Sequence, residues 1–398
     1  MGAAVIDRAD QFPIGASITV DQLEREPYGA LAALREAEPV SWVPALGAWL
    51  VTRRDLAVAA MRDAETFTVD DPRFTTAAVI GPSMLSLDGA EHERHRRAFA
   101  PHFRPSVVRE QFEAELVDRA HELVGAIQPL GSAELRTAIA GPLAVDTITR
   151  FLGLDNVNAG DVLSWYGHIS KSIVELTLGR PVSADASAAI AEIHRRVSVS
   201  VDSGSSRLLA AMNAEAILRP EELPAETAVV MFGAIETSEG MTANLLWHLL
   251  THPDALGRVL DDRSLLTAAI EESLRLEPAA AVVDRYTTRA VAFGGAVIPE
   301  RDMVMISLLG ANRDPSVFPE PDRFDIDRSN TSQHVTFVQG PHGCIGLHLA
   351  RLETHAGVSA VLDGLHDISL DVAASSAPEG LIFRKPASVV ASWASVKP

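Results

Sequence analysis

Residues 337–346 read FVQGPHGCIG, a glycine-rich segment that contains Cys344, the only cysteine of the 398-residue chain. The following residues, 347–362 (LHLARLETHAGVSAVL), space apolar side chains three and four apart, which predicts a helix. The thiol is therefore expected where a loop enters a helix N-terminus, whose unpaired N–H groups favour a thiolate. Such a thiolate is a candidate nucleophile or metal ligand, and the alternative is a buried, inert core cysteine.

The rest of the sequence predicts a mainly α fold with minor β structure. Helical spacing dominates from about 110 to 270, for example over 112–127, 133–154 and 186–201. Short β-branched runs between 279 and 310 and another near the C-terminus predict small sheets, and the proline-rich stretch 312–328 is expected to be irregular. No linker or repeat marks a boundary. We therefore expect one domain over 1–398, with a mostly helical body over about 90–275 and a β-rich part with the cysteine loop over about 279–398.

The cysteine segment resembles the haem-binding loop of the cytochrome P450 family, Phe-x-x-Gly-x-x-x-Cys-x-Gly. The four matching positions are Phe337, Gly340, Cys344 and Gly346. In that family the cysteine thiolate is the proximal ligand of haem b, and the resemblance implies this role for Cys344. It also implies that Phe337 packs beside the thiolate and that His342 reaches a haem propionate. Val338 stands where the family usually has glycine, a departure expected to alter the loop geometry without preventing ligation.

A second family element lies upstream in the segment 268–278, AAIEESLRLEP. Glu272 and Arg275 fit the pattern Glu-x-x-Arg, and their three-residue spacing puts both side chains on one helix face. Taken alone, such a pair is usually an exposed and weak ion pair. The family has a buried Glu–Arg–Arg cluster, and the resemblance implies that Arg323 in Pro-Asp-Arg-Phe supplies the second arginine. The expected role of this cluster is structural, because it holds the irregular stretch and thus the cysteine loop.

The resemblance also implies a set of groups for the two haem propionates. His92 and Arg96 match the His-x-x-x-Arg pattern of the propionate-binding helix, and four-residue spacing places them on one face. Arg285 lies on the first expected strand after the Glu-x-x-Arg helix, where the family has another propionate-binding arginine. With His342, these groups would offset the cost of burying two carboxylates beside an apolar macrocycle.

The segment 223–252 is long, apolar and helical in spacing, yet it contains Glu236 and Thr237 near its middle. Its sequence Gly-Ala-Ile-Glu-Thr fits the family's distal helix over the haem. The resemblance implies that Gly233 and Ala234 leave room for O₂ and water, that Thr237 orients the bound oxygen, and that Glu236 relays protons from solvent. The structural alternative is a Thr237 hydroxyl bonded to the carbonyl four residues earlier and a Glu236 that faces solvent.

Family position also implies a substrate pocket with small apolar walls, suited to a small hydrophobic organic compound. It involves the stretches 72–87, 165–185, 232–237, 280–283 and 387–390. The individual candidates are Phe232, Ala280, Ala281, Val282, Val283 and Val389. No flavin or ferredoxin module fits in the remaining length, so electrons are expected from a separate ferredoxin or flavodoxin with its reductase. A basic docking patch would include Arg97, Arg104 and Arg351.

The overall charge excludes several other classes of protein. The formal net charge of −19 disfavours binding to nucleic acid or to anionic membranes. No apolar stretch approaches the length of a bilayer crossing, and the N-terminus lacks the basic and apolar regions of a signal peptide. One cysteine permits no internal disulfide and no multi-cysteine metal site, which indicates a reducing compartment and predicts a cytoplasmic protein. Within the P450 family, the resemblance is to the bacterial, soluble class.

The main functional prediction is a haem-thiolate monooxygenase that hydroxylates or epoxidises its substrate, as in secondary metabolism. Three alternatives remain open at this point. The same haem could catalyse desaturation or oxidative coupling, or the protein could bind haem without turnover, which the Glu236–Thr237 pair argues against. A non-haem site could use Cys344 with His348 or His355, but these residues supply few of the ligands that a structural zinc normally takes.

Overall fold

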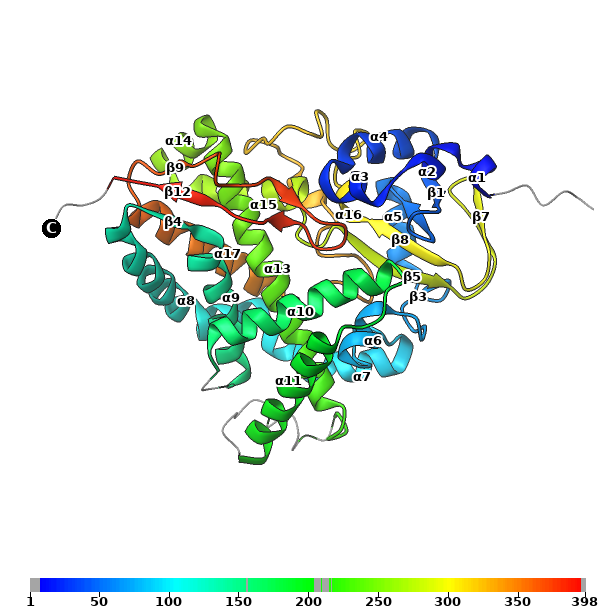
Figure 1. Ribbon diagram of the computed structural model, residues 1–398, viewed down its shortest axis with the longest axis horizontal. Helices are drawn as coiled ribbons and strands as arrows, with labels where there is room; N and C mark the ends of the chain where they lie inside the picture. Colours follow the sequence, from blue (N-terminus) through cyan, green and yellow to red (C-terminus); the bar gives the residue numbers. More distant parts are fainter. Residues whose placement is uncertain (1–7, 155–156, 204–208, 210–214, 216, 395–398) are drawn as a thin grey trace, which may run out of the picture.

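The computed structural model describes residues 8–154, 157–203, 209, 215 and 217–394, and helices make up most of these residues (Figure 1). The first helices are α1 (Arg8–Gln11), α2 (Pro13–Ser17), α3 (Val20–Arg25), α4 (Pro27–Ala37), α5 (Arg54–Arg62), α6 (Thr75–Ile80) and α7 (Gly89–Phe99). The later helices are α8 (Pro105–Ile127), α9 (Gly141–Leu152), α10 (Ala159–Thr177), α11 (Ala184–Ser203), α13 (Leu223–Thr251), α14 (Pro253–Asp261), α15 (Leu266–Leu276), α16 (Leu308–Ala311) and α17 (Leu347–Gly364). The mainly α prediction is confirmed.

The strands form four small sheets. The five-stranded sheet has the order β1 (Val40–Val43), β2 (Ala48–Val51), β8 (Met303–Ser307), β5 (Val282–Thr287), β3 (Phe67–Thr68). All its neighbours are antiparallel except β2 and β8. The other sheets join β6 (Val291–Phe293) to β7 (Ala296–Ile298), β10 (Pro378–Glu379) to β11 (Lys385–Pro386), and β4 (Ser132–Glu134) to β12 (Val390–Ser392) and β9 (Ser369–Leu370). The short runs expected between 279 and 310 are thus β5 to β8.

One predicted helix begins later than its spacing indicates. Residues 132–134 form β4, which pairs with β12, and a π-helical turn over Arg136–Ala140 leads into α9. The cause is local, because the Glu134 carboxylate accepts hydrogen bonds from the N–H groups of Arg136 and Thr137 and from that of Val389. The helix therefore starts only after this carboxylate-centred turn.

The helix α13 runs through the helical part of the molecule (Figure 1) and packs against α9, α10, α11, α15 and α17. Most of its side chains are buried, including Glu226, Glu236 and Glu239. In Figure 1 the helices α8, α9, α13 and α17 lie on one side, and the five-stranded sheet lies with α1 to α5 on the other. Among the described residues, none of the helices combines the length and apolar character that a bilayer crossing requires.

Candidate functional site

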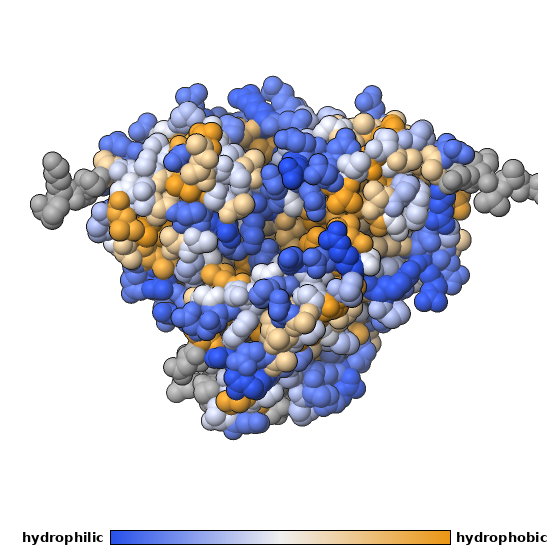
Figure 2. Space-filling view, in the orientation of Figure 1, coloured by the Kyte–Doolittle hydropathy of each residue, from blue (hydrophilic) through white to orange (hydrophobic). Residues whose placement is uncertain are grey.

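A cavity of about 1750 Å³, which includes its solvent-open part, lies between α13 and the cysteine loop. Its walls also come from α6, α7, α10, β5 and the segment before β11, and most of the lining side chains are apolar. On the face shown in Figure 2, hydrophobic residues gather near the centre, between the C-terminal strands and α10, while most of the surrounding surface is hydrophilic.

The cysteine loop has a fixed backbone that presents Cys344 to the cavity. The N–H of Cys344 donates to the carbonyl of Phe337 at 2.8 Å, and the guanidinium of Arg96 donates to the carbonyl of Gly343 at 2.6 Å. Gly340 has a φ of +78°, and a Cβ there would lie 2.6 Å from the carbonyl oxygen of Met61. A side chain at this position would push the loop away from its support, which explains the need for glycine.

Burial and hydrogen bonding act on the Cys344 thiol in opposite directions. Burial raises its pKa, while the N–H of Gly346 and the charges of Arg96 and Arg351 act to lower it, and the net shift of the pKa is upward. The helix N-terminus therefore does not by itself produce a thiolate, contrary to the expectation from sequence, because desolvation outweighs the N–H contribution. A positive centre bound to the sulfur would favour the thiolate instead.

Val338 adopts a φ of +63°, in the left-handed region. For a β-branched side chain this conformation is a steric outlier, whereas glycine adopts it freely. Its N–H donates to the carbonyl of Val335 at 2.8 Å, which fixes the turn. The departure from the family pattern thus places a strained residue six positions before Cys344.

Arg351, His334 and an aromatic ring join the cysteine loop to α15. The Arg351 guanidinium lies 4.4 Å from the centre of the Phe337 ring and contacts the Glu271 carboxylate at 2.5 and 2.9 Å. His334 Nε2 lies 3.2 Å from the same carboxylate. Burial acts to raise the pKa of Glu271, but Arg351 and His334 outweigh it and lower the pKa to about 2. Glu271, which the sequence analysis did not single out, is therefore a support of the loop.

Glu272 and Arg275 form a fully buried, two-point ion pair with distances of 2.8 Å. The second arginine of the cluster is Arg328, whose Nε donates to Glu272 Oε1 at 3.0 Å. The assignment of this role to Arg323 is wrong. The side chain of Arg323 is 62% exposed and pairs with Glu320, and only its carbonyl meets Arg275 and Arg328. The turn over 323–328 returns the chain to Glu272, so that Arg328 lies above the carboxylate while Arg323 faces solvent.

The four propionate candidates lie together at one end of the cavity and all of them line it. Arg285 is almost fully buried, and its NH2 nitrogen has no hydrogen-bond partner among the described residues. His342 Nε2 lies 2.7 Å from Asp88, and the two ring nitrogens of His92 lie 2.8 and 3.2 Å from the carbonyls of Met84 and Pro341. The histidines therefore already have protein partners, whereas Arg285 has an unused donor.

Asp88, at the N-cap of α7, is a further residue that the sequence analysis did not single out. Burial acts to raise the pKa of Asp88, but hydrogen bonds from His342, from the Thr68 hydroxyl and from the Val69 N–H outweigh it and lower the pKa. This ionised carboxylate links His342 of the cysteine loop to β3. It thereby fixes the ring of His342 at the edge of the cavity.

On α13, the residues Gly233, Ala234 and Thr237 line the cavity opposite the cysteine loop. The Thr237 hydroxyl donates to the carbonyl of Gly233, which is the structural alternative expected for a mid-helix threonine, yet the side chain also borders the cavity. No Cβ contact within 4 Å would restrict Gly233, so the space beside it is open.

Glu236 does not face solvent, contrary to the structural alternative given in the sequence analysis. Its side chain is 8% exposed, and it contacts Ser170 of α10 at 2.8 Å and Lys385 Nζ at 2.9 Å. Lys385 also binds Glu239 at 2.6 Å. Burial acts to lower the pKa of Lys385, but the two carboxylates outweigh it and raise the pKa. Lys385, which the sequence analysis did not single out, therefore fixes the position of the Glu236 side chain.

Four of the six pocket candidates line the cavity, namely Phe232, Ala280, Val282 and Val283. The assignments of Ala281 and Val389 are wrong. Ala281 is buried on the other side of its segment, near Leu31 and Met305, because neighbouring residues of an extended chain point to opposite faces. Val389 is completely buried beside β4, where its N–H donates to Glu134.

Two acidic residues of the cavity wall were also not anticipated. Asp284 on β5 and Glu353 on α17 each have one buried carboxylate oxygen without a hydrogen-bond partner among the described residues. Burial raises the pKa of Glu353 to about 8, against a hydrogen bond from Thr147. Burial likewise raises the pKa of Asp284 to about 6, against Arg285 and a hydrogen bond from Thr75. Single acidic residues in β and helical runs carry no signal that distinguishes them in the sequence.

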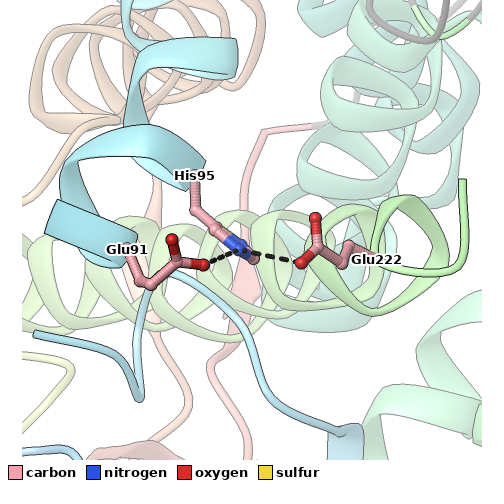
Figure 3. Close-up of side chains that lie close together, drawn as sticks. All are labelled: Glu91, His95 and Glu222. Carbon is pink, nitrogen blue, oxygen red and sulfur yellow. Dashed lines mark ion pairs between the residues drawn. The ribbon is translucent and has the colours of Figure 1, made fainter. Parts of the chain in front are cut away.

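Figure 3 shows Glu91, His95 and Glu222, the only group of three or more His, Cys, Asp or Glu side chains with ligand atoms within 4.8 Å of one another in the part of the chain that the structure describes. Arg94 lies between the two carboxylates, at 2.6 Å from Glu91 and 2.9 Å from Glu222. A guanidinium thus supplies the positive charge there, and His95 Nδ1 lies 2.5 Å from the buried Glu226. The group is an ion-pair cluster that joins α7 to α13.

The non-haem alternative for Cys344 lacks ligands within the described ranges. His348 and His355 are both exposed on α17, and the group in Figure 3 does not include the cysteine. A protein metal centre requires several ligand atoms that converge on one point. The geometry therefore favours a ligand for the thiol that enters through the cavity.

Comparison with known proteins gives concordant matches. The family model described as Cytochrome P450 matches residues 186–365. The chain is 31% identical to Cytochrome P450 107B1 of Saccharopolyspora erythraea over 397 residues, which covers 92% of this chain and 93% of that protein. It is 32% identical to the Cytochrome P450 monooxygenase PikC of Streptomyces venezuelae, over 87% of this chain and 86% of that protein.

The fold also matches a solved structure. The crystal structure of P450BioI, in complex with an acyl carrier protein ligated to hexadec-9Z-enoic acid, superposes with a TM-score of 0.85 and 23% identity. The match covers 94% of this chain and 100% of that one.

Proposed function

The chain belongs to the cytochrome P450 family and is a monooxygenase, and we propose that it carries haem b on Cys344 and hydroxylates or epoxidises a small hydrophobic organic compound in the cavity below α13. The observation that supports this most directly is that one cavity is lined both by Cys344, in its glycine-rich loop, and by Gly233, Ala234 and Thr237 of α13. Hydroxylation or epoxidation is favoured over desaturation, oxidative coupling and binding without turnover, since the relative PikC is a monooxygenase, an enzyme that inserts an oxygen atom into its substrate.

The residues present fit a haem. The cavity has mostly apolar walls, and the thiol borders it, as ligation of a haem by Cys344 would require. The unpaired NH2 donor of Arg285 is a buried cationic group that calls for an anionic partner, since an unsatisfied buried donor costs on the order of 1–3 kcal/mol. A carboxylate of the cofactor would supply that partner.

In this proposal Cys344 is the protein ligand of the iron, and Phe337 packs beside its sulfur. Arg285, Arg96, His92 and His342 hold the propionates, with Arg285 as the group that is free to do so in the present geometry. Gly346 follows the thiol closely, and its N–H donates a hydrogen bond to the sulfur.

When bound, haem supplies the activation of O₂ with two electrons and the transfer of one oxygen atom to the substrate. The protein supplies position and protons. Gly233 and Ala234 leave open space at the cavity wall, and the Thr237 hydroxyl, which can rotate away from the Gly233 carbonyl, offers a donor and an acceptor there. Glu236 is the nearest ionisable residue along α13 and serves as the proton source for Thr237.

Lys385 and Ser170 set the position of Glu236 in this relay. Glu236 contacts both Lys385 and Ser170. Lys385 is also bound to Glu239 at 2.6 Å, so it can release the Glu236 carboxylate and keep Glu239 as its partner. Because Lys385 is 21% exposed, its ammonium connects the buried carboxylates to solvent. Proton entry therefore runs along the Lys385 side of α13.

The Glu272–Arg275–Arg328 cluster and Glu271 have a structural role. Together they hold the stretch 312–328 and the cysteine loop against α15, and a buried carboxylate with two guanidinium partners is strongly held. Their function is to keep the sulfur at a fixed position in the cavity.

A separate electron donor completes the activity, and a ferredoxin or flavodoxin with its reductase is the proposed source. Arg97 and Arg104 are exposed near the cysteine loop and suit an acidic partner, whereas Arg351 is engaged with Glu271. A cytoplasmic location stays a prediction from the single cysteine.

The test is to purify the holoprotein, record the spectrum of the reduced carbon-monoxide complex, and screen hydrophobic compounds for a shift of the ferric Soret band. Compounds that shift the band are then incubated with NADH and surrogate redox partners, and the products are analysed for one added oxygen atom. A thiolate-type spectrum with oxygenated product supports the proposal. A folded protein that binds no haem contradicts it.

A further inference from the structure

Asp284 is an acidic residue of the cavity wall, next to the apolar residues Val282 and Val283. It lies on β5 between Val283 and Arg285, and β5 forms one side of the cavity. Across from it, α6 contributes Thr75 and Thr76, both of which are buried and line the same cavity. The Thr75 hydroxyl donates a hydrogen bond to the Asp284 carboxylate.

One oxygen of this carboxylate is unused. Oδ1 of Asp284 is buried and has no hydrogen-bond partner among the described residues. Arg285 does not supply one, because its NH1 nitrogen donates to the main-chain carbonyl of Asp284 instead. A buried carboxylate oxygen without a partner is costly, and a hydrogen bond to a charged donor is among the strongest ways to satisfy it.

No other role in the proposed function accounts for Asp284. The remaining ionisable residues of the cavity are those assigned to the haem and Glu353, which lies on α17 two turns after the cysteine. Asp284 faces the part of the cavity bordered by α6 and lies in the same wall as Val282 and Val283. Burial raises the pKa of Asp284 to about 6, against Arg285 and Thr75, so the carboxylate is still ionised above neutral pH.

We propose that Asp284 is a specificity-determining residue that binds a protonated amine of the substrate, so that the preferred substrates are hydrophobic compounds with one basic nitrogen. This inference rests on the proposed function and specifies its substrate class. The apolar walls bind the hydrophobic body, and the ammonium N–H donates to Oδ1 of Asp284 while Thr75 keeps the second oxygen in place. A neutral compound of the same shape leaves the carboxylate unpaired and binds more weakly.

The experiment compares two probes of equal shape, N,N-dimethyl-4-phenylbutylamine and its hydrocarbon analogue (5-methylhexyl)benzene. Their dissociation constants are measured by equilibrium dialysis against the holoprotein, with the ferric absorption spectrum recorded in parallel. The variants are Asp284→Asn, which keeps the shape and removes the charge, and Thr76→Val as a control that keeps both the carboxylate and its hydrogen bond from Thr75. Dialysis reports binding independently of turnover.

The expected result is that the wild-type protein binds the amine at least about tenfold more tightly than the hydrocarbon, the range of a hydrogen bond to a charged group. Asp284→Asn should lose most of this preference while its affinity for the hydrocarbon stays within about twofold, and Thr76→Val should keep most of the preference. Equal affinities in the wild-type protein, or a preference that survives in Asp284→Asn, would overturn the inference. So would a spectrum that shows the amine nitrogen bound to iron.

The carboxylate could alternatively serve only to stabilise the start of α6. In that case Asp284→Asn would weaken both probes alike and lower the unfolding midpoint, which also overturns the inference. The reduced carbon-monoxide spectrum of the same samples separates this failure from a failure of the proposed function. A thiolate-type spectrum without an amine preference contradicts only the role of Asp284.

Discussion

The Arg328 guanidinium lies 3.0 Å from the completely buried carboxylate of Glu272 and is itself only 6% exposed. The carboxylate also receives two hydrogen bonds from Arg275 and one from the N–H of Asp325. The Glu272 side chain of α15 thus binds Arg275 on its own helix and also Asp325 and Arg328 in the stretch that leads to the cysteine loop.

The first prediction compares the two arginines of this stretch. Arg328→Ala should lower the free energy of unfolding by roughly 3–5 kcal/mol and reduce haem content, because it leaves part of a buried carboxylate unpaired. Arg323→Ala is the matched control, since its side chain is exposed, and should change the free energy by less than about 0.5 kcal/mol. Urea unfolding and haem per protein measure both. Equal effects of the two variants would contradict the assignment.

The second prediction concerns the thiol. Cys344→Ala should abolish the thiolate-type spectrum of the reduced carbon-monoxide complex, because no other sulfur exists in the chain except in methionine side chains. Circular dichroism of the same sample serves as the control and should stay that of a helical protein. An unchanged carbon-monoxide spectrum would refute Cys344 as the ligand.

The third prediction separates the hydroxyl of Thr237 from its bulk. Thr237→Ala should retain haem yet consume several times more NADH per product formed, since the hydroxyl that passes protons is lost. Thr237→Ser keeps the hydroxyl and should retain most of the coupling. The ratio of product to NADH is the measurement, and full coupling in Thr237→Ala would show that the hydroxyl is not needed.

The fourth prediction tests the strain at Val338. Val338→Gly should raise the free energy of unfolding by about 1 kcal/mol, because relief of roughly 1–3 kcal/mol of backbone strain exceeds the entropy that glycine adds to the unfolded chain, about 0.4–1 kcal/mol. Val338→Ala keeps a Cβ at the same φ and should gain less. A loss of stability in the glycine variant would mean that Val338 contributes more by packing than it costs by strain.

The fifth prediction follows from the raised pKa of Glu353, which is about 8 in the folded protein. The unfolded chain loses this proton near its ordinary pKa of about 4.3, whereas the folded protein keeps it, so the folded state loses stability as pH rises between these values. Glu353→Gln removes this dependence and should be more stable than the wild type at pH 8 by about 4–5 kcal/mol, with little difference near pH 4.5. Urea unfolding across this range measures the difference, and a gap that does not grow with pH would show that Glu353 is ionised in the fold.

Much of this site can be predicted from the spacing of residues that lie close together in the sequence. The loop over 337–346, the Glu272–Arg275 pair and the long helix with Gly233 and Thr237 depend on residues near one another in the chain, where periodicity and turn geometry decide the structure. The small sheets between 279 and 310 were likewise predicted from β-branched runs. Their completion by β1 and β2, more than 200 residues upstream, was not predicted, because strand pairing over such a distance leaves no local signal.

The errors have a common cause. Arg323 and Arg328 both follow Pro321 in an irregular stretch, and only the path of the chain decides which of them meets Glu272. Ala281 lies between Ala280 and Val282, which line the cavity, and composition cannot distinguish these positions. Val389 donates its N–H to Glu134, and a contact between segments so far apart in the sequence leaves no local signal. The partners of Glu236 and the orientation of Asp284 depend on contacts between distant elements, so the structure was required to find them.

Three consecutive residues just before and at the start of β11 have different tasks: Phe383 borders the cavity, Arg384 is buried in an ion pair with Glu277, and Lys385 binds Glu236. Substitutions of Phe383 that reshape the cavity for a new ligand would also move the ammonium of Lys385, which lies two residues later in the same segment. Engineering for a broader range of substrates should therefore leave residues 383–385 unchanged and vary α6 first. This keeps Glu236 in place, so that NADH consumption stays coupled to product formation.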